Sequence, residues 1–135
     1  MMVTGSFKSA VDGGFLNIYS GAVPASANAA LGSAVLLCQL SDNGLGSGLN
    51  FESTPVDGVL AKSIAQVWKG TNVATGTASF FRYVAAGDDG SVSSSAIRIQ
   101  GTVGVVAADF IVASVLFTSG VDFAPGFFSV ALPTL

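Results

Sequence analysis

The sequence predicts an all-β fold, an antiparallel sandwich or barrel of about eight or nine short strands. Short runs of apolar, β-branched and aromatic residues recur along the chain. Clusters of Gly, Asp, Asn, Ser and Pro separate these runs at intervals of about ten residues, which is the spacing of strands joined by turns. No long segment repeats its apolar residues with the 3.6-residue period of a helix.

The first half of the chain contains five strand candidates, each bounded by turn-forming residues. They lie at 15–19, 34–40, 49–52, 59–62 and 66–69. The run 34–40 is apolar at every position except Gln39, which favours a strand buried on both faces. Between the first two candidates, the alanine-rich segment 24–31 begins with Pro24, which predicts one or two helical turns ended by Gly32.

Four further strands are expected in the second half, at 77–85, 96–103, 109–117 and 126–132. In the first of them, side chains at even positions from Ala78 to Val84 lie on one face, and those at odd positions from Thr77 to Tyr83 on the other. In 96–103, Ile97, Ile99 and Val103 share one face and Arg98, Gln100 and Thr102 the other. The Asp- and Gly-rich stretch before it predicts a hairpin connection.

The chain is expected to form a single domain at 15–135, preceded by an N-terminal arm at 1–14 that is rich in small and polar residues. Residues 1–10 lack the apolar core of a signal peptide. The densest apolar run, 110–117, is far shorter than the roughly 20 residues of a spanning helix, so no membrane partner is expected. Five scattered basic residues and a net charge of −3 argue against a nucleic-acid partner.

The residue inventory predicts a protein without catalytic, metal or cofactor sites. The chain has no His and one Cys, so a histidine-assisted serine nucleophile and a zinc site are both excluded. A catalytic Ser–Lys dyad formed by the adjacent Lys62 and Ser63 is not expected, because neighbouring side chains on a strand point to opposite faces. Most of the acidic residues stand in turn-like stretches, where Asp bonds to local backbone groups. Cys38 is expected to be a small buried apolar side chain, which fits a reducing cytoplasm.

The aromatic residues Trp68, Phe80, Phe81 and Tyr83 allow either a platform for sugars or bases or packing in the core and at an interface, and packing is the favoured interpretation. Several strands carry apolar residues on both faces, whereas a small sandwich buries one face of each sheet. The second face then needs a loop, an arm or another subunit. We therefore expect a homo-oligomer or docking on a scaffold, with the arm as a possible strap. The candidate interface residues are Phe7, Tyr19, Trp68, Phe81, Arg82 and Tyr83.

Two groups of segments resemble small virion proteins of tailed bacteriophages. One is Leu16–Gly21, Pro24–Ala30 and Leu36–Cys38, and the other is Trp68–Gly70 with Gly76–Arg82. The resemblance covers about residues 15–85. It implies a virion structural role, most like a capsid decoration (cement) protein with a jelly-roll-like sandwich that binds the major capsid protein or other virion proteins.

By the same resemblance, the chain is expected in the virion after assembly in the host's bacterial cytoplasm. A position in the neck, tail or baseplate stays open. Outside the resemblance, a glycan-binding β-module is the main alternative, and it requires Tyr19, Trp68 or Tyr83 to be exposed beside polar donors.

Overall fold

The computed structural model describes residues 13–27, 29–51, 59–63, 66–85, 98–112, 114–125 and 129–131. Within these ranges the protein is all-β, with eleven strands and no helix, which confirms the predicted class. The strands are β1 (Phe15–Ser20), β2 (Val35–Asp42), β3 (Val59–Ala61), β4 (Trp68–Thr71), β5 (Gly76–Thr77), β6 (Phe80–Val84), β7 (Arg98–Gly104), β8 (Phe110–Ile111), β9 (Leu116–Phe117), β10 (Asp122–Phe123) and β11 (Ser129–Ala131).

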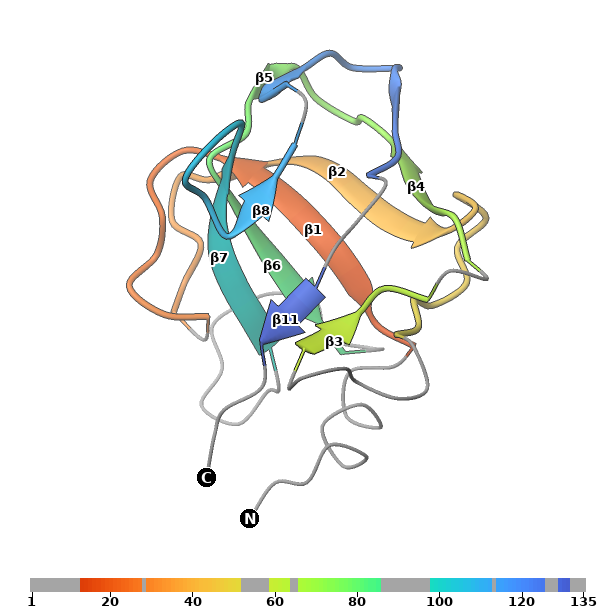
Figure 1. Cartoon of the computed structure of the whole chain (residues 1–135). Coiled ribbons are helices and arrows are strands. Elements are labelled where there is room, and N and C mark those ends of the chain that lie inside the picture. The colour runs from red at the N-terminus through yellow and green to blue at the C-terminus, as the bar shows by residue number, and fades with distance from the viewer. Residues whose placement is uncertain are drawn as a thin grey trace.

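Seven of these strands form one curled sheet in the order β10-β4-β2-β1-β6-β7-β8. All neighbours in it are antiparallel except β7 and β8. The curl brings the two end strands together, so that the rings of Phe110 in β8 and Phe123 in β10 lie 6.3 Å apart. The pair β3–β11 crosses the open side of the sheet, and the pair β5–β9 closes one end (Figure 1).

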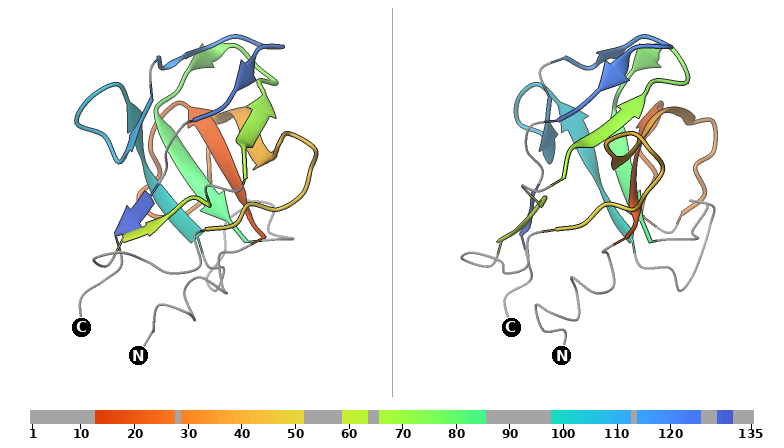
Figure 2. Two further views of the ribbon diagram at one scale, coloured as in Figure 1. Left: turned by 45° about the vertical axis from the view of Figure 1, so that its right-hand side comes forward. Right: turned by 90° about the vertical axis from the view of Figure 1, so that its right-hand side faces the viewer.

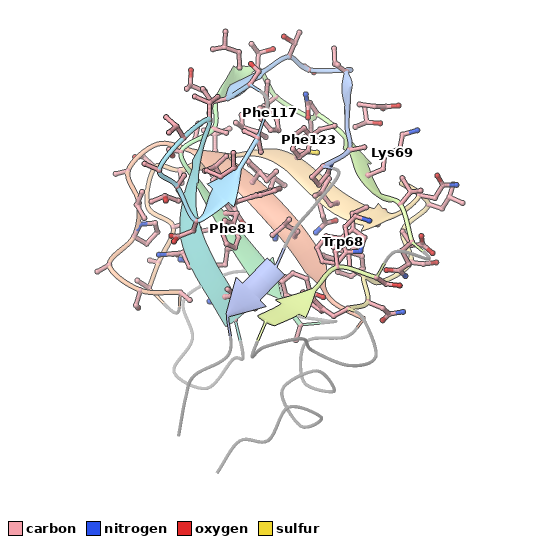
Figure 3. The ribbon with its side chains drawn as sticks, in the orientation of Figure 1. Trp68, Lys69, Phe81, Phe117 and Phe123 are labelled. Atoms are coloured by element: carbon pink, nitrogen blue, oxygen red, sulfur yellow. The ribbon has the colours of Figure 1, made fainter. Side chains whose placement is uncertain are left out.

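The hydrophobic core lies on the concave face of this sheet. In the register of β1 with β6, Leu16 faces Tyr83 and Ile18 faces Phe81, and all four are buried in one cluster. Phe81, Phe117 and Phe123 extend the cluster toward β5–β9, and Trp68 fills its other side (Figure 3). The predicted alternation is confirmed over β6, where Phe81 and Tyr83 share the core face. It is wrong at 78 and 79, because Ala78 packs in the core and Ser79 Oγ donates to Gly21 O (2.6 Å) on the other face, at the point where the chain passes from β5 to β6.

A β-bulge explains why apolar residues follow one another without alternation at 34–38, before the polar Gln39. Ile18 pairs with Cys38 whereas Tyr19 pairs with Leu36, which leaves Leu37 as the extra residue of β2. The bulge lets the adjacent side chains of Leu37 and Cys38 both enter the core. The prediction that both faces of this strand are buried is wrong, because Val35 is 50% exposed.

The convex face of the sheet is covered by the chain itself. Residues 21–27 and 29–34, here called the strap, lie on the side of the sheet opposite β3 and β11 (Figure 2). Beneath it, the rings of Tyr19 and Phe80 stack 5.0 Å apart with an interplanar angle of 12°. A loop of the same chain thus provides the cover that the two-faced apolar strands were expected to need.

Three polar side chains of the convex face hold the strap through its main-chain carbonyl oxygens. Arg82 Nη2 donates to Ser26 O (3.3 Å), Arg98 Nη1 to Ala27 O (3.1 Å) and Gln100 Nε2 to Pro24 O (2.9 Å). The helical turns predicted at 24–31 are absent from the described part of that segment. The reason is that these carbonyl groups accept hydrogen bonds from the sheet, whereas in a helix they would accept from residues four positions later.

Other departures from the prediction reflect changes of strand partner. The expected strand 109–117 is two strands, because β8 pairs with β7 whereas β9 pairs with β5. Residues 49–51 contribute isolated bridges in place of a strand. Gly13 and Gly14, the end of the predicted arm, exchange main-chain hydrogen bonds with Leu49. Residues 1–12 of the arm lie outside the described residues, as does the turn of the expected hairpin before β7.

The buried position of Cys38 predicts an unreactive thiol. Burial, and secondarily the negative charge of Asp122, raise its pKa from 9.0 to about 12. We expect a thiol reagent to leave the native protein unmodified and to label Cys38 fully in denaturant. Because the unfolded thiol ionises at lower pH than the folded one, this group's contribution to stability is lost as the pH rises from about 9 to 12. Labelling of the native protein at the unfolded rate would contradict this position.

Candidate interaction surface

The structure places five of the six candidate interface residues in the interior. Tyr19, Trp68, Phe81, Arg82 and Tyr83 are all buried, and Phe7 lies outside the described residues. The assignment of these five to a surface contact is therefore corrected: in the folded chain their side chains have almost no accessible area to give to a partner.

The aromatic residues among them form packed clusters, as the core-packing interpretation predicts. Phe51 lies edge-on to Trp68 with ring centroids 5.3 Å apart, and 5.4 Å from Tyr83. The polar atoms of these rings have internal partners: Trp68 Nε1 donates to Gln66 Oε1 (3.2 Å) and the Tyr83 hydroxyl to Leu49 O (3.2 Å). Buried Trp and Tyr retain such partners because an unpaired polar atom is costly away from water.

Arg82 has a structural position between the sheet and the strap. Its Nε and Nη2 atoms both donate to Gln100 Oε1, at 3.2 and 2.8 Å, and Nη2 also reaches Ser26 O. Asn17 of β1, which pairs with Arg82 across the sheet, accepts a hydrogen bond from Gln39 Nε2 (2.9 Å). This row of polar groups positions the strap, and it explains why a charged side chain occupies a fully buried place on β6.

The exposed charged side chains of the described ranges serve local structure. Lys62 Nζ donates to the carbonyl oxygens of Gln66 (3.0 Å) and Ser63 (3.4 Å). Lys69 pairs with Asp122 at 3.3 Å, which links β4 to β10. The hydrogen bond from Thr71, together with the hydrogen bond and charge of Lys69, lowers the pKa of Asp122.

Neither a metal centre nor a membrane-spanning helix is seen in the described ranges. No three His, Cys, Asp or Glu side chains lie close enough there to hold an ion. The same residues contain no helix of the length and apolarity needed to cross a bilayer.

One exposed apolar feature is the connection between β7 and β8, residues 105–109, here called the valine loop. Val105 is 54% exposed and Val106 is 75% exposed. Ala107 follows them with φ of +53°, a conformation that residues with a Cβ adopt at an energetic cost. Backbone strain beside exposed apolar side chains is characteristic of loops that make contacts with other molecules.

Hydrogen bonds at the base of the valine loop fix its position against the sheet. Asp109 Oδ2 accepts from Thr102 N (3.0 Å), and Asp109 N donates to Thr102 Oγ1 (3.1 Å). Gly101 makes room for this arrangement, because a Cβ there would lie 2.8 Å from both the Asp109 side chain and the Phe81 ring. Because the main-chain N–H of Thr102 in β7 already donates to Asp109, it is not available to pair with a further strand at that position.

This arrangement can present a small apolar contact without ordering a loop on binding. Two β-branched side chains stand on a backbone that is already fixed, so little conformational entropy is lost when a partner covers them. The loop was not among the sites predicted from the sequence, because residues 104–108 follow one expected strand and precede the next. The sequence does contain one signal for it: two apolar residues, Val105 and Val106, stand in a predicted connection between Gly104 and Asp109, where polar residues are usual. Comparison with family models, curated proteins and solved structures finds no match to this chain.

Proposed function

We propose that this protein is a non-enzymatic virion structural protein of a tailed bacteriophage. Its proposed role is that of a capsid decoration protein, which binds the lattice of the major capsid protein and stabilises it. The valine loop carries this proposal, because it offers a fixed, exposed apolar contact that suits adhesion. The sequence resemblance over residues 15–85 supports the same role.

A decoration protein requires a contact of modest strength repeated many times. Each copy that covers Val105 and Val106 buries a small apolar area, which favours binding at roughly 25 cal/mol per Å² before the costs of association. Placement of many copies on one lattice raises the total stabilisation without strengthening any single contact. A small chain with few charged side chains and a fixed apolar loop meets this requirement.

The jelly-roll-like sandwich expected of such a protein and its localisation in the virion belong to the same proposal. A layered arrangement supports the sandwich, since β3–β11 lies across the concave face of the seven-stranded sheet. The glycan-binding alternative loses its support, because Tyr19, Trp68 and Tyr83 are buried.

The substitution Val106→Asp tests the proposed contact. We expect the variant to bind capsids that lack this protein at least about tenfold more weakly than the wild-type protein does, because a carboxylate in a desolvated contact costs about 1.4 kcal/mol or more. Binding is measured by co-sedimentation of the purified protein with the capsids. Leu45→Asp is the matched control, since Leu45 is 80% exposed in the turn after β2. Equal binding by the Val106→Asp variant and the wild-type protein would contradict a contact through the valine loop.

A further inference from the structure

The ribbon that closes one end of the sheet has a second apolar surface. Residues 73–77 and 114–118, here called the cap ribbon, include the paired strands β5 and β9. Their side chains alternate between the interior and the solvent: Ala74, Val115 and Phe117 pack on the core. The outer face is fully accessible, with Val73 at 63% and Leu116 at 73% exposure. Its other members are the exposed Thr75, Thr77, Ser114 and Thr118.

The outer face of the cap ribbon lies within uncharged stretches of the chain. No Asp, Glu, Lys or Arg occurs between residues 70 and 81 or between residues 110 and 121. The charged residues that flank these stretches include Lys69 and Asp122, which neutralise each other as an ion pair at 3.3 Å. The net charge of −3 therefore comes from other parts of the molecule.

The free edge of the ribbon is blocked at one position. Leu116 N is not available to pair with a further strand, because it already donates to Ser114 Oγ at 3.1 Å. Ser119 N donates to Thr75 Oγ1 at 3.0 Å, which ties the two sides of the ribbon together. Contact through this ribbon is consequently expected across its face, where Val73 and Leu116 stand, and not along its edge.

We propose that two copies of this chain associate face to face through the outer faces of their cap ribbons, related by a two-fold axis. In such a contact a surface meets itself, so a charge at or near the axis would face its own copy. A face of valine, leucine, threonine and serine avoids that repulsion and buries apolar area from both copies. This association goes beyond the proposed capsid role and does not depend on it, because the valine loop is a separate surface.

The small size of the cap ribbon sets the expected strength of the pair. Stable interfaces usually bury about 800 Å² on each partner, and the two short segments of the cap ribbon, 73–77 and 114–118, offer less than that. We therefore expect a pair that dissociates on dilution, with a dissociation constant in the micromolar range or weaker, on the order of 10 μM to 1 mM.

Sedimentation velocity over a range of concentrations of the full chain tests the proposal. The wild-type protein should shift from monomer to dimer as the concentration rises, and Leu116→Asp should remain monomeric at every concentration. Leu45→Asp, which places the same charge on a remote and equally exposed leucine, should dimerise as the wild type does. Val106→Asp should also dimerise, which separates this contact from the valine loop. Circular dichroism and thermal melts of each variant show that the fold is retained.

Mixing two variants tests the two-fold geometry directly. Leu116→Asp and Leu116→Lys should each be monomeric alone, whereas an equimolar mixture should form a heterodimer, because opposite charges then meet across the axis. A wild-type protein that stays monomeric up to millimolar concentration would overturn the proposal. So would a Leu116→Asp variant that dimerises normally, or a mixture that fails to associate, because the ribbon would then not face itself.

Discussion

The substitution Trp68→Ala should lower the free energy of unfolding by about 3–5 kcal/mol, the usual cost of truncating a buried Trp. Trp68 is fully buried against Phe51 and Tyr83. Its removal also frees Gln66 Oε1 from the hydrogen bond with the indole. Chemical denaturation followed by circular dichroism measures the change, and an exposed ligand-binding Trp at this place would give a far smaller loss.

The neighbouring residue provides the control for this prediction. Val67 is about half exposed, so Val67→Ala should change the free energy of unfolding by less than about 0.5 kcal/mol. Because Trp68 is the one Trp of the chain, its fluorescence reports on its environment alone. We expect blue-shifted native emission that resists quenching by acrylamide and shifts to longer wavelength on unfolding. Native emission that is quenched as readily as that of the unfolded chain would contradict a buried Trp68.

The substitution Gln100→Leu should destabilise the protein by about 3 kcal/mol and loosen the strap. Gln100 Oε1 accepts two hydrogen bonds from the buried Arg82, and Gln100 Nε2 holds Pro24 O. A hydrogen bond to a charged group contributes about 1.5–3 kcal/mol, and the loss is largest when a buried charge is left poorly paired. Denaturation measures the stability, and hydrogen exchange measures protection of the strap.

A second Gln→Leu substitution separates the strap effect from a general one. Gln39 is exposed and donates to Asn17 Oδ1, so Gln39→Leu should cost less than about 1 kcal/mol and leave the strap unchanged. Elastase, which cleaves after small residues, should cut the alanine-rich strap faster in Gln100→Leu than in Gln39→Leu or the wild type. Equal cleavage of all three proteins would show that Gln100 does not hold the strap.

Local patterning in the sequence was enough to predict the class of the fold and several of its strands. The alternation predicted for 80–84 and 98–103 matches the core and convex faces of β6 and β7, because the two strands pair in a regular antiparallel register. It fails at Ala78 and Ser79, where the chain passes from β5 to β6. The short strands were harder to predict. β5 and β10 have two residues each, and their existence depends on partners distant in the sequence, which no local pattern encodes.

The strap and the candidate surface show where sequence reasoning failed for physical reasons. Alanine content favours a helix at 24–31, but side chains from β6 and β7, more than 50 residues away, compete for its carbonyl groups. The aromatic residues around Arg82 were expected at an interface because strands with two apolar faces need cover. The strap supplies that cover, and the exposed apolar side chains proposed here as contacts lie instead in the valine loop and the cap ribbon.

The copy number of this chain in phage particles tests the proposed function most directly. Quantitative mass spectrometry of purified virions gives the ratio of this chain to the major capsid protein. A decoration protein predicts a ratio within a few-fold of one. A small fixed number of copies per particle would contradict a role on the shell and indicate the neck, tail or baseplate, and absence from the particle would contradict a virion role altogether.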